Sequence, residues 1–409
     1  MIEIDAVSKR YPDGTTAVDR LTLEIPDRSI TVLVGPSGCG KTTTLRMINR
    51  MIEPTDGRIL LDGQDIRERP VNALRRSMGY VIQHAGLFPH RTIVENIGTV
   101  PRLLGWDRQR SRSRALELME RVGLDQSLAK RYPYQLSGGQ QQRVGVARAL
   151  AADPPVLLMD EPFSAVDPIV RKGLQDELLR IQADLGKTIV FVTHDIDEAI
   201  KLGDMVAVLR EGGYLAQYAP PNQLLSAPAD EFVEDFLGAD RGIRHLSFFD
   251  ASGLELTSEP IVAEDATPEQ IRALSARTAP QTPYLLVTDT EGRPLGWSRA
   301  ADLAAGADAE RLPYGHAFHL GRDSLRAALD SAVLSPTGWA VAVDDEGRAA
   351  GVAAQETIAE AIRTAHAARS VVTDKVVTGQ AGTEKVVTGQ AGTGKVVTDE
   401  VAMDKGGRS

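Results

Sequence analysis

The chain has 409 residues, with 46 Lys and Arg against 56 Asp and Glu, and so carries a formal net charge of −10. This length predicts two or three domains, and a hydrophobic content of 42% excludes a chain that is disordered throughout. The acidic balance argues against a nucleic-acid partner bound on a broad basic face.

Two absences bear on where the protein works. Cys39 is the single cysteine, so an internal disulfide is impossible and a reducing compartment is expected. No run approaches the roughly 18 apolar residues that a membrane helix requires, and the first residues lack the basic and apolar segments of a secretory signal. We therefore expect a soluble, cytoplasmic protein, which another chain would hold at a membrane.

Short apolar runs alternate with helical patterns through the first half of the chain. Leu21, Leu23 and Ile25 alternate with polar residues, as in a half-buried strand. Short, mainly apolar runs predict buried parallel strands at 30–34, 156–159 and 188–192. Helices are expected from Lys41 onwards, over 111–123 and over 168–185. Strands that alternate with helices predict an α/β fold with a mainly parallel sheet.

A glycine-rich segment follows the first of these buried strands and opens a helix. Residues 35–42 read Gly-Pro-Ser-Gly-Cys-Gly-Lys-Thr and fit the phosphate-loop pattern G-x-x-x-x-G-K-[ST] completely. The glycines let backbone N–H groups wrap phosphate oxygens, and the helix directs its positive end at the same charge. Lys41 is expected to reach the β- and γ-phosphates, and the Thr42 hydroxyl to bind Mg²⁺. Cys39 is interpreted as a small loop residue, with a redox role as the alternative.

Two carboxylates follow the strand predicted at 156–159. That strand end lies beside the phosphate loop in a doubly wound sheet, so Asp160 fits a Mg²⁺ ligand and Glu161 a residue that polarises the attacking water. A second small-residue turn, Leu-Ser-Gly-Gly-Gln at 136–140, leads into the helical run QQRVGVARAL. It is predicted to bind phosphate at a helix N-terminus.

With these motifs in this order, residues 1–237 resemble the ATP-binding cassette subunit of ABC transporters, a P-loop NTPase with a RecA-like core and a helical subdomain at about 86–155. In that family the 136–140 turn of one subunit completes the ATP site of the other. The resemblance therefore implies a head-to-tail dimer that binds ATP and Mg²⁺. Its implied nucleotide contacts are Gly35, Ser37, Gly38, Cys39, Gly40, Lys41, Thr42, Thr43, Ser137, Gly138, Gly139, Gln140 and Asp167.

Four of the implied roles concern residues outside the two glycine turns. Tyr11 matches the aromatic residue that stacks on adenine, with a surface tyrosine near a turn as the alternative. Gln83 matches the glutamine that senses Mg²⁺ and γ-phosphate, Asp167 closes a dimer-interface motif at 164–167, and His194 matches the histidine that contacts the γ-phosphate. The implied catalytic group is Glu161, His194 and Gln83, and the implied Mg²⁺ ligands are Thr42, Gln83 and Asp160.

The spacing of the motifs and the absence of further segments indicate which class of ABC protein the chain resembles. Only 96 positions separate Gly40 from Leu136, which leaves no room for the long coiled coil of repair ATPases, and neither a second cassette nor fused membrane helices are present. Stretches such as GPSGCGKTTTLRMINRMIEPTDGRI and EFVEDFLGADRG resemble the ATPase subunits of quaternary-amine osmoprotectant importers, which take up glycine betaine, choline, carnitine or proline betaine.

That resemblance implies three further partners or locations. The ATPase would work with a membrane permease and, through it, with an extracytoplasmic substrate-binding protein, and it would lie on the cytoplasmic face of the cell membrane.

Leu87 and Phe88 would fill the groove that receives a short helix of the permease; packing inside the helical subdomain is the alternative. A different solute, an amino acid or a polyamine, is the alternative for the transporter as a whole.

The composition changes after residue 238. Residues 241–369 contain no lysine, and the segment at 290–296 returns 55 residues later at 345–351, each time after a β-rich run. This spacing predicts a duplicated helix–strand–turn–strand–helix unit. Beyond a linker at 238–256, residues 257–365 resemble a tandem α+β CBS pair, the regulatory appendage of that transporter group, with copies at about 257–310 and 316–365.

The nucleotide-binding pattern of such modules is incomplete in both copies. The first keeps the ribose-binding Asp302 but has Arg299 at the hydroxyl position, and the second, at 351–357, has neither. An anionic ligand, a response to ionic strength and a mere brace for the dimer, as in the amino-acid or polyamine alternative, stay open; the last two rank above a nucleotide. His316 and His319 are expected in a surface loop and not at a metal.

The end of the chain consists of decapeptide repeats. KVVTGQAGTE at 375–384 returns directly as KVVTGQAGTG. A Gly- and Thr-rich repeat without aromatic residues cannot close a core, so residues 366–409 are predicted to be a low-complexity, disordered tail.

Overall fold

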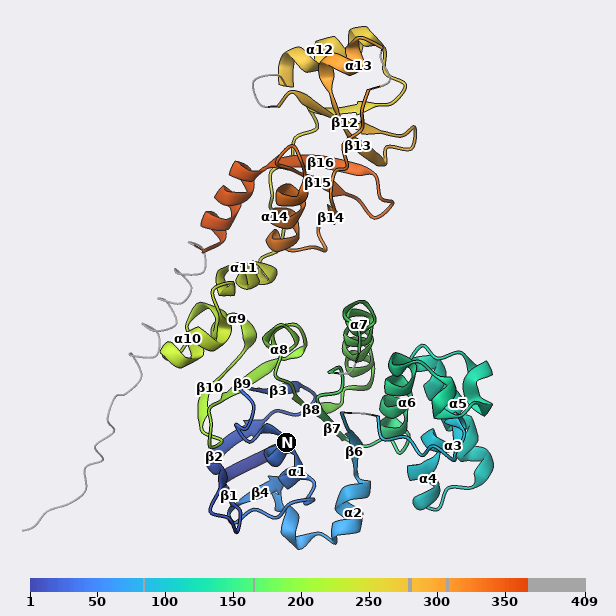
Figure 1. The fold of residues 1–409 in the computed structure, drawn as a ribbon, viewed down its shortest axis with the longest axis vertical. Coiled ribbons are helices and arrows are strands. Elements are labelled where there is room, and N and C mark those ends of the chain that lie inside the picture. The colour runs from blue at the N-terminus through green and yellow to red at the C-terminus, as the bar shows by residue number, and fades with distance from the viewer. Residues whose placement is uncertain (84, 165, 279–281, 307–308, 367–409) are drawn as a thin grey trace, which may run out of the picture. The chain divides into compact units, whose positions relative to one another are not determined.

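The computed structural model describes residues 1–83, 85–164, 166–278, 282–306 and 309–366 (Figure 1). They form two compact units, residues 1–248 and a second unit that begins at Phe249. The tail predicted from 366 lies outside the described residues beyond its first position, as does position 165 of the interface motif. None of the helices in the described ranges is both long and apolar enough to cross a bilayer.

Two sheets build the first unit. The smaller one is antiparallel, in the order β2-β1-β4-β5, with β1 (Ile2–Arg10), β2 (Thr16–Ile25), β4 (Asp56–Leu61) and β5 (Gln64–Asp65). The larger one, in the order β10-β9-β3-β8-β7-β6, is parallel except for its edge strand β10. Its strands are β3 (Ile30–Val34), β6 (Met78–Val81), β7 (Val156–Asp160), β8 (Thr188–Val192), β9 (Met205–Leu209) and β10 (Leu215–Ala219). The predicted α/β fold with a mainly parallel sheet is confirmed.

Helices cover this sheet and form a lateral group. Figure 1 shows α3 to α6 gathered beside the sheet, at the place of the predicted helical subdomain. The helices of the first unit are α1 (Lys41–Ile48), α2 (Val71–Arg76), α3 (Ile93–Ile97), α4 (Thr99–Leu103), α5 (Arg108–Arg121), α6 (Gly138–Leu150), α7 (Pro168–Leu185), α8 (Ile196–Leu202), α9 (Pro221–Ser226), α10 (Glu231–Leu237) and α11 (Arg241–His245). Four 3₁₀ turns join them, at Ile66–Glu68, Gln126–Lys130, Pro133–Gln135 and Leu246–Phe248.

The start of α5 differs from the sequence expectation, which placed it at residue 111. The Asp107 side chain accepts a hydrogen bond from the Arg110 N–H, 2.8 Å away, and so caps a helix that begins at Arg108. The end agrees within two residues, because Gly123 has a φ of +65° and leaves the helical conformation.

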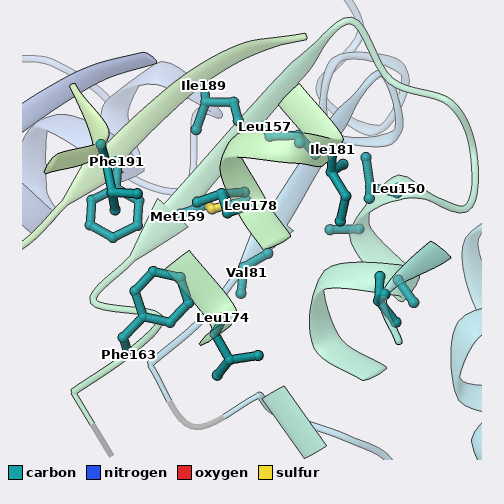
Figure 2. Close-up of a cluster of buried hydrophobic side chains, with 14 of the residues drawn as sticks. Val81, Leu150, Leu157, Met159, Phe163, Leu174, Leu178, Ile181, Ile189 and Phe191 are labelled. Carbon is teal, nitrogen blue, oxygen red and sulfur yellow. The ribbon is translucent and has the colours of Figure 1, made fainter. Parts of the chain in front are cut away.

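The core beside α7 fixes the strand ends that matter for function. Leu174, Leu178 and Ile181 are spaced four and three residues apart, so they share one face of α7 and are buried. Figure 2 shows this face against side chains of the sheet, and the Phe163 and Phe191 rings have centroids 5.6 Å apart. Each such side chain contributes about 1.5–3 kcal/mol on burial, which holds the carboxyl ends of β7 and β8 in place.

The linker expected at 238–256 is in part an ordered piece of the first unit. It contains α11 and a 3₁₀ turn, and the unit extends to Phe248. Arg244 binds the Asp197 carboxylate at 2.7 Å through Nε and the Leu237 carbonyl at 2.5 Å through Nη1. These contacts tie α11 to α8 and to the end of α10.

The second unit contains the same set of elements twice. The first copy has β11 (Ile261–Ala263), α12 (Pro268–Thr278), β12 (Tyr284–Thr288), β13 (Pro294–Arg299) and α13 (Ala300–Ala304). The second has β14 (Ala317–His319), α14 (Leu325–Leu334), β15 (Trp339–Val343), β16 (Ala349–Ala354) and a helical stretch at 355–366. In each copy the first strand pairs parallel with the second, and the second pairs antiparallel with the third.

The turns of the two copies match in detail. Asp289 and Asp344, 55 residues apart, each accept hydrogen bonds from the backbone N–H groups two and four residues further on. The copies also share a hydrophobic cluster, in which Leu286 and Trp297 of the first meet buried side chains of the second: Trp339, Val341 and Val352. The prediction of a surface loop at His319 is wrong, because β14 includes this residue and pairs with β15.

Candidate nucleotide-binding site

The phosphate loop connects β3 to α1, and its backbone conformation requires glycine at both ends. Gly35 has a φ of +153° and Gly40 a φ of +88°. A Cβ atom at Gly35 would lie 2.3 Å from the Leu209 carbonyl oxygen, and one at Gly40 would lie 2.3 Å from that of Ala17. The loop lies directly against β9 and the start of β2, so neither position can accept a side chain.

Lys41 is buried inside the loop that it follows. Its Nζ donates to the carbonyl oxygens of Gly35 at 2.7 Å and Pro36 at 2.8 Å, and lies 3.6 Å from Cys39 Sγ. Burial raises the pKa of the Cys39 thiol although the ammonium beside it acts in the opposite direction. The sulfur is therefore a neutral thiol, which disfavours the redox alternative.

Thr42 and Asp160 are brought together by the first turn of α1 and the last residue of β7. The Thr42 hydroxyl donates to Asp160 Oδ1 at 2.9 Å, and the Asp160 side chain is largely buried. Thr43 is half-buried in the same helical turn. No cluster of three or more His, Cys, Asp or Glu with metal-binding geometry exists in the described ranges.

Glu161 stands at the centre of a second group, formed by the ends of three neighbouring strands. Its Oε2 lies 3.2 Å from His194 Nδ1 and accepts a hydrogen bond from Gln83 Nε2 at 3.3 Å. Gln83 follows β6, Glu161 follows β7 and His194 follows β8. The three residues expected to be catalytic therefore meet at one carboxylate. Of the three residues expected to bind Mg²⁺, Thr42 and Asp160 contact each other, whereas Gln83 contacts Glu161 instead.

The Glu161 backbone is strained. Its φ of +44° is in the left-handed region, which costs a non-glycine residue about 1–3 kcal/mol. The Glu161 N–H donates to the Val192 carbonyl at 3.0 Å, and the Ser164 hydroxyl donates to the Glu161 carbonyl at 3.0 Å. These bonds hold the strained residue, and its side chain leaves the strand toward β8.

The turn at 136–140 begins α6. The Ser137 hydroxyl accepts from the Gln140 N–H at 3.3 Å, while the Gln140 side chain accepts from the Ser137 N–H at 3.0 Å, a reciprocal cap around Gly138 and Gly139. Asp167 caps α7 without such a reciprocal bond: its side chain accepts from the N–H groups of Ile169 and Val170. Among the described residues, no hydrogen bond joins either cap to the phosphate loop of the same chain.

Tyr11 and the segment after Gln83 complete the placement of the predicted residues. Tyr11 lies in the turn between β1 and β2, with Lys9 Nζ 5.4 Å from its ring centroid. Leu87 packs against the hydrophobic core, which agrees with the alternative of internal packing, whereas Phe88 is 39% exposed.

Sequence reasoning missed three residues that contact this site. Arg46 Nη2 lies 3.8 Å from Asp160 Oδ2, and the Tyr80 hydroxyl donates to the same oxygen at 3.5 Å. Burial, and then the Asp160 charge, raise the pKa of Tyr80 to about 12. Arg148 of α6 donates to the carbonyls of Ala85 and Gly86 at 2.6 and 2.7 Å, just after Gln83. Only Arg46, one helical turn after Thr42, carried a usable spacing signal.

Comparison with known proteins agrees with this geometry. Residues 18–164 match the ABC transporter family model. The osmoprotectant import ATP-binding protein OsmV of Salmonella typhimurium is 44% identical over 381 residues, which are 91% of this chain and 98% of the relative. The glycine betaine uptake system ATP-binding protein YehX of Escherichia coli is 48% identical, over 74% of this chain and 99% of its own.

Solved structures give the same class. The ATP-binding cassette MJ0796, in a dimeric post-hydrolysis state bound to ADP and Pi, is 33% identical, with a TM-score of 0.50 over 54% of this chain and 99% of that one. The chain belongs to the ABC transporter family, as an ATP-binding subunit. It is an ATPase coupled to transport, and the predicted P-loop fold is confirmed.

Proposed function

We propose that this chain is the ATP-hydrolysing subunit of an importer for glycine betaine or a related quaternary-amine osmoprotectant. The observation that carries the solute class is the 44% identity to an osmoprotectant import protein across 98% of its length, including the second unit. A separate membrane permease would carry the solute, delivered by an extracytoplasmic substrate-binding protein. The ATPase would act as a peripheral subunit on the cytoplasmic face of the cell membrane.

The proposed nucleotide contacts follow from the loop geometry. ATP phosphates would lie against the N–H groups of residues 35–43, and Lys41 Nζ would exchange the carbonyls of Gly35 and Pro36 for the β- and γ-phosphates. Tyr11 would stack on the adenine. Ser137, Gly138, Gly139, Gln140 and Asp167 would complete the site of a second copy in a head-to-tail dimer, as the dimeric solved relative supports.

The hydrolytic roles rest on the Glu161 group. Its carboxylate would accept a hydrogen bond from the attacking water and orient the water toward the γ-phosphate, while His194 would contact that phosphate and Gln83 would sense it. The Thr42 hydroxyl and Asp160 carboxylate, 2.9 Å apart, are the hard oxygen donors that Mg²⁺ prefers, and Gln83 adds an amide oxygen. Bound Mg²⁺ would neutralise phosphate charge.

The second unit is proposed to be a regulatory CBS pair. Its repeated topology and matched turns support a duplicated module. Arg299, the residue that would meet an anionic ligand in one of the three readings, lies with its guanidinium carbon 5.8 Å from the Tyr284 ring centroid. The incomplete nucleotide pattern of both copies favours the two readings without a nucleotide: a response to ionic strength or a brace for the dimer.

Uptake by the reconstituted transporter tests the proposal. Proteoliposomes that contain the permease and this ATPase should accumulate labelled glycine betaine or choline on addition of ATP, and the Lys41→Ala variant should abolish uptake. Accumulation of an amino acid or a polyamine, with no competition by quaternary amines, would contradict the solute class. A salt titration of the same vesicles would show whether the second unit regulates transport.

A further inference from the structure

A buried carboxylate lies behind His194 and takes no part in the function proposed above. Glu198 is on α8 and is 5% exposed. Burial raises the pKa of its carboxyl, and the negative charge of Asp195 acts in the same direction. A leucine would fill this core position without the cost of burying a charge, so the carboxylate requires an explanation from its contacts.

The two oxygens of Glu198 bind two different elements. Oε2 accepts a hydrogen bond of 2.7 Å from the Thr193 hydroxyl, in the loop after β8. Oε1 accepts one of 3.3 Å from Gln175 Nε2, on α7. Both partners are also buried, at 2% and 7% exposure. One carboxylate therefore connects α7 to the loop after β8, in a place where water does not compete.

Each of these elements carries a residue of the proposed ATP site. Thr193 directly precedes His194, whose Nδ1 lies 3.2 Å from Glu161. Helix α7 begins after Asp167, which caps it, and Arg171 of its first turns donates to the Val166 carbonyl at 3.0 Å. Movement of the interface residues 166–167 would thus move α7, and with it the partner of Glu198.

A cation at the same junction lacks part of its hydrogen bonding. Arg171 Nη1 is 3.7 Å from Asp195 and Arg171 Nε is 4.0 Å from Glu198 Oε1. The Nε group is buried and makes no hydrogen bond within the described residues. A small shift of α7 toward α8 would close the gap to Glu198, so the length of this contact would follow the position of α7.

We propose that Glu198 is a positioning residue that couples α7 to the loop carrying His194, and so sets where His194 stands relative to Glu161. This inference rests on the proposed hydrolytic role of His194. It assigns the buried Thr193–Glu198–Gln175 chain the task of transmitting the state of the dimer interface, at 166–167, to the γ-phosphate contact.

The test compares variants of the full chain in steady-state ATP hydrolysis. Glu198→Gln keeps the side-chain shape but places an amide where Gln175 and Arg171 need an acceptor. It should lower kcat about tenfold, while KM for ATP changes less than about twofold. Gln175→Met removes the α7 side alone and should lower kcat in the same direction. Asp176→Asn is the matched control, because its exposed ion pair of 2.6 Å with Lys201 also joins α7 to α8.

A double-mutant cycle with His194→Ala separates positioning from packing. If Glu198 acts through His194, then Glu198→Gln should reduce the residual rate of the His194→Ala variant less than about twofold. An equal loss in both backgrounds, or wild-type kcat for both Glu198→Gln and Gln175→Met, would overturn the inference. If Glu198→Gln does not fold, Gln175→Met decides alone. A wild-type chain without turnover would instead contradict the proposed function.

Discussion

At the scale of single residues, Glu161 combines backbone strain with a side chain held between two neighbours. Its left-handed conformation follows a fully buried strand, which fixes the preceding residues. The strain is therefore maintained by β7 and by the hydrogen bond to Val192, and it directs the carboxylate to His194 and Gln83. A change of charge at this position can be made without a change of shape.

Glu161→Gln should keep ATP binding, abolish turnover and trap a closed dimer. The amide retains the volume of the carboxylate but cannot orient the attacking water as a hydrogen-bond acceptor of full charge. Phosphate release and gel filtration with ATP measure the two effects, and Glu211→Gln, in an exposed turn, is the control. Turnover by Glu161→Gln at the wild-type rate would contradict the assignment.

Glu198 predicts a pH dependence of stability at the same scale. Folding raises the pKa of this carboxyl, mainly by burial, so the folded state binds the proton more tightly than the unfolded chain. The wild type therefore loses stability as pH rises through the folded pKa, and Glu198→Gln does not. We expect the melting temperature of the variant, relative to that of the wild type, to be higher at pH 8 than at pH 5. A difference independent of pH would contradict this.

At the scale of elements, α6 holds the segment after Gln83 through one side chain. Burial lowers the pKa of the Arg148 guanidinium, yet its two bonds to the Ala85 and Gly86 carbonyls remain those of a charged donor. Ala85 has a φ of +53°, so the same bonds retain a strained backbone. Helix α6 thus connects two parts of the site: its start carries the 136–140 turn, and Arg148 near its end holds the segment that follows Gln83.

Arg148→Met should lower the free energy of unfolding by about 3 kcal/mol, because two carbonyls lose a charged donor. Urea denaturation measures the change. Arg180→Met is the control: its ion pair with Glu177 is exposed, with the arginine side chain 69% accessible, and should contribute about 0.5 kcal/mol or less. Equal losses of stability for the two variants would show that the two hydrogen bonds of Arg148 contribute no more than an exposed ion pair.

Leu87 and Phe88 are adjacent but should respond differently to the same change. Leu87→Ser removes a side chain packed on the core and should cost about 2–4 kcal/mol of stability. Phe88→Ser alters a half-exposed ring and should leave stability and basal ATPase activity of the isolated subunit unchanged, while it lowers transport by the complete importer. Equal loss of ATPase activity and transport in Phe88→Ser would argue against contact with the permease.

Elements that carry a continuous pattern were predictable from sequence. β3, β7 and β8 are buried on both faces, so each is an apolar run, and α7 shows the helical period. α11 and β14 were missed because five and three residues are too short for a period. Arg148 and Glu198 were missed because their partners lie on other elements, and their contacts exist only after folding.

At the scale of the whole chain, the boundary after Phe248 predicts how the ATPase can be separated. A chain truncated after Phe248 should retain ATP binding and basal hydrolysis, because α11 and its contacts remain. Truncation after Gly238 removes Arg244 and should lower the melting temperature by about 5 °C. Thermal unfolding with and without ATP compares the two. Equal melting temperatures would show that residues 239–248 are a linker after all.

The hydrophobic cluster shared by the two copies of the second unit has a consequence for cooperativity. Leu286 and Trp297 of one copy are covered by Trp339 and Val352 of the other, so a separated copy would expose these side chains, although the first copy also has a cluster of its own around Leu285 and Val287. Both copies should melt in a single calorimetric transition, and the two halves of a chain cut between them should be more stable when mixed than when apart. The shared cluster therefore constrains both halves to vary together, whereas the exposed Asp302 lies outside it and can change alone.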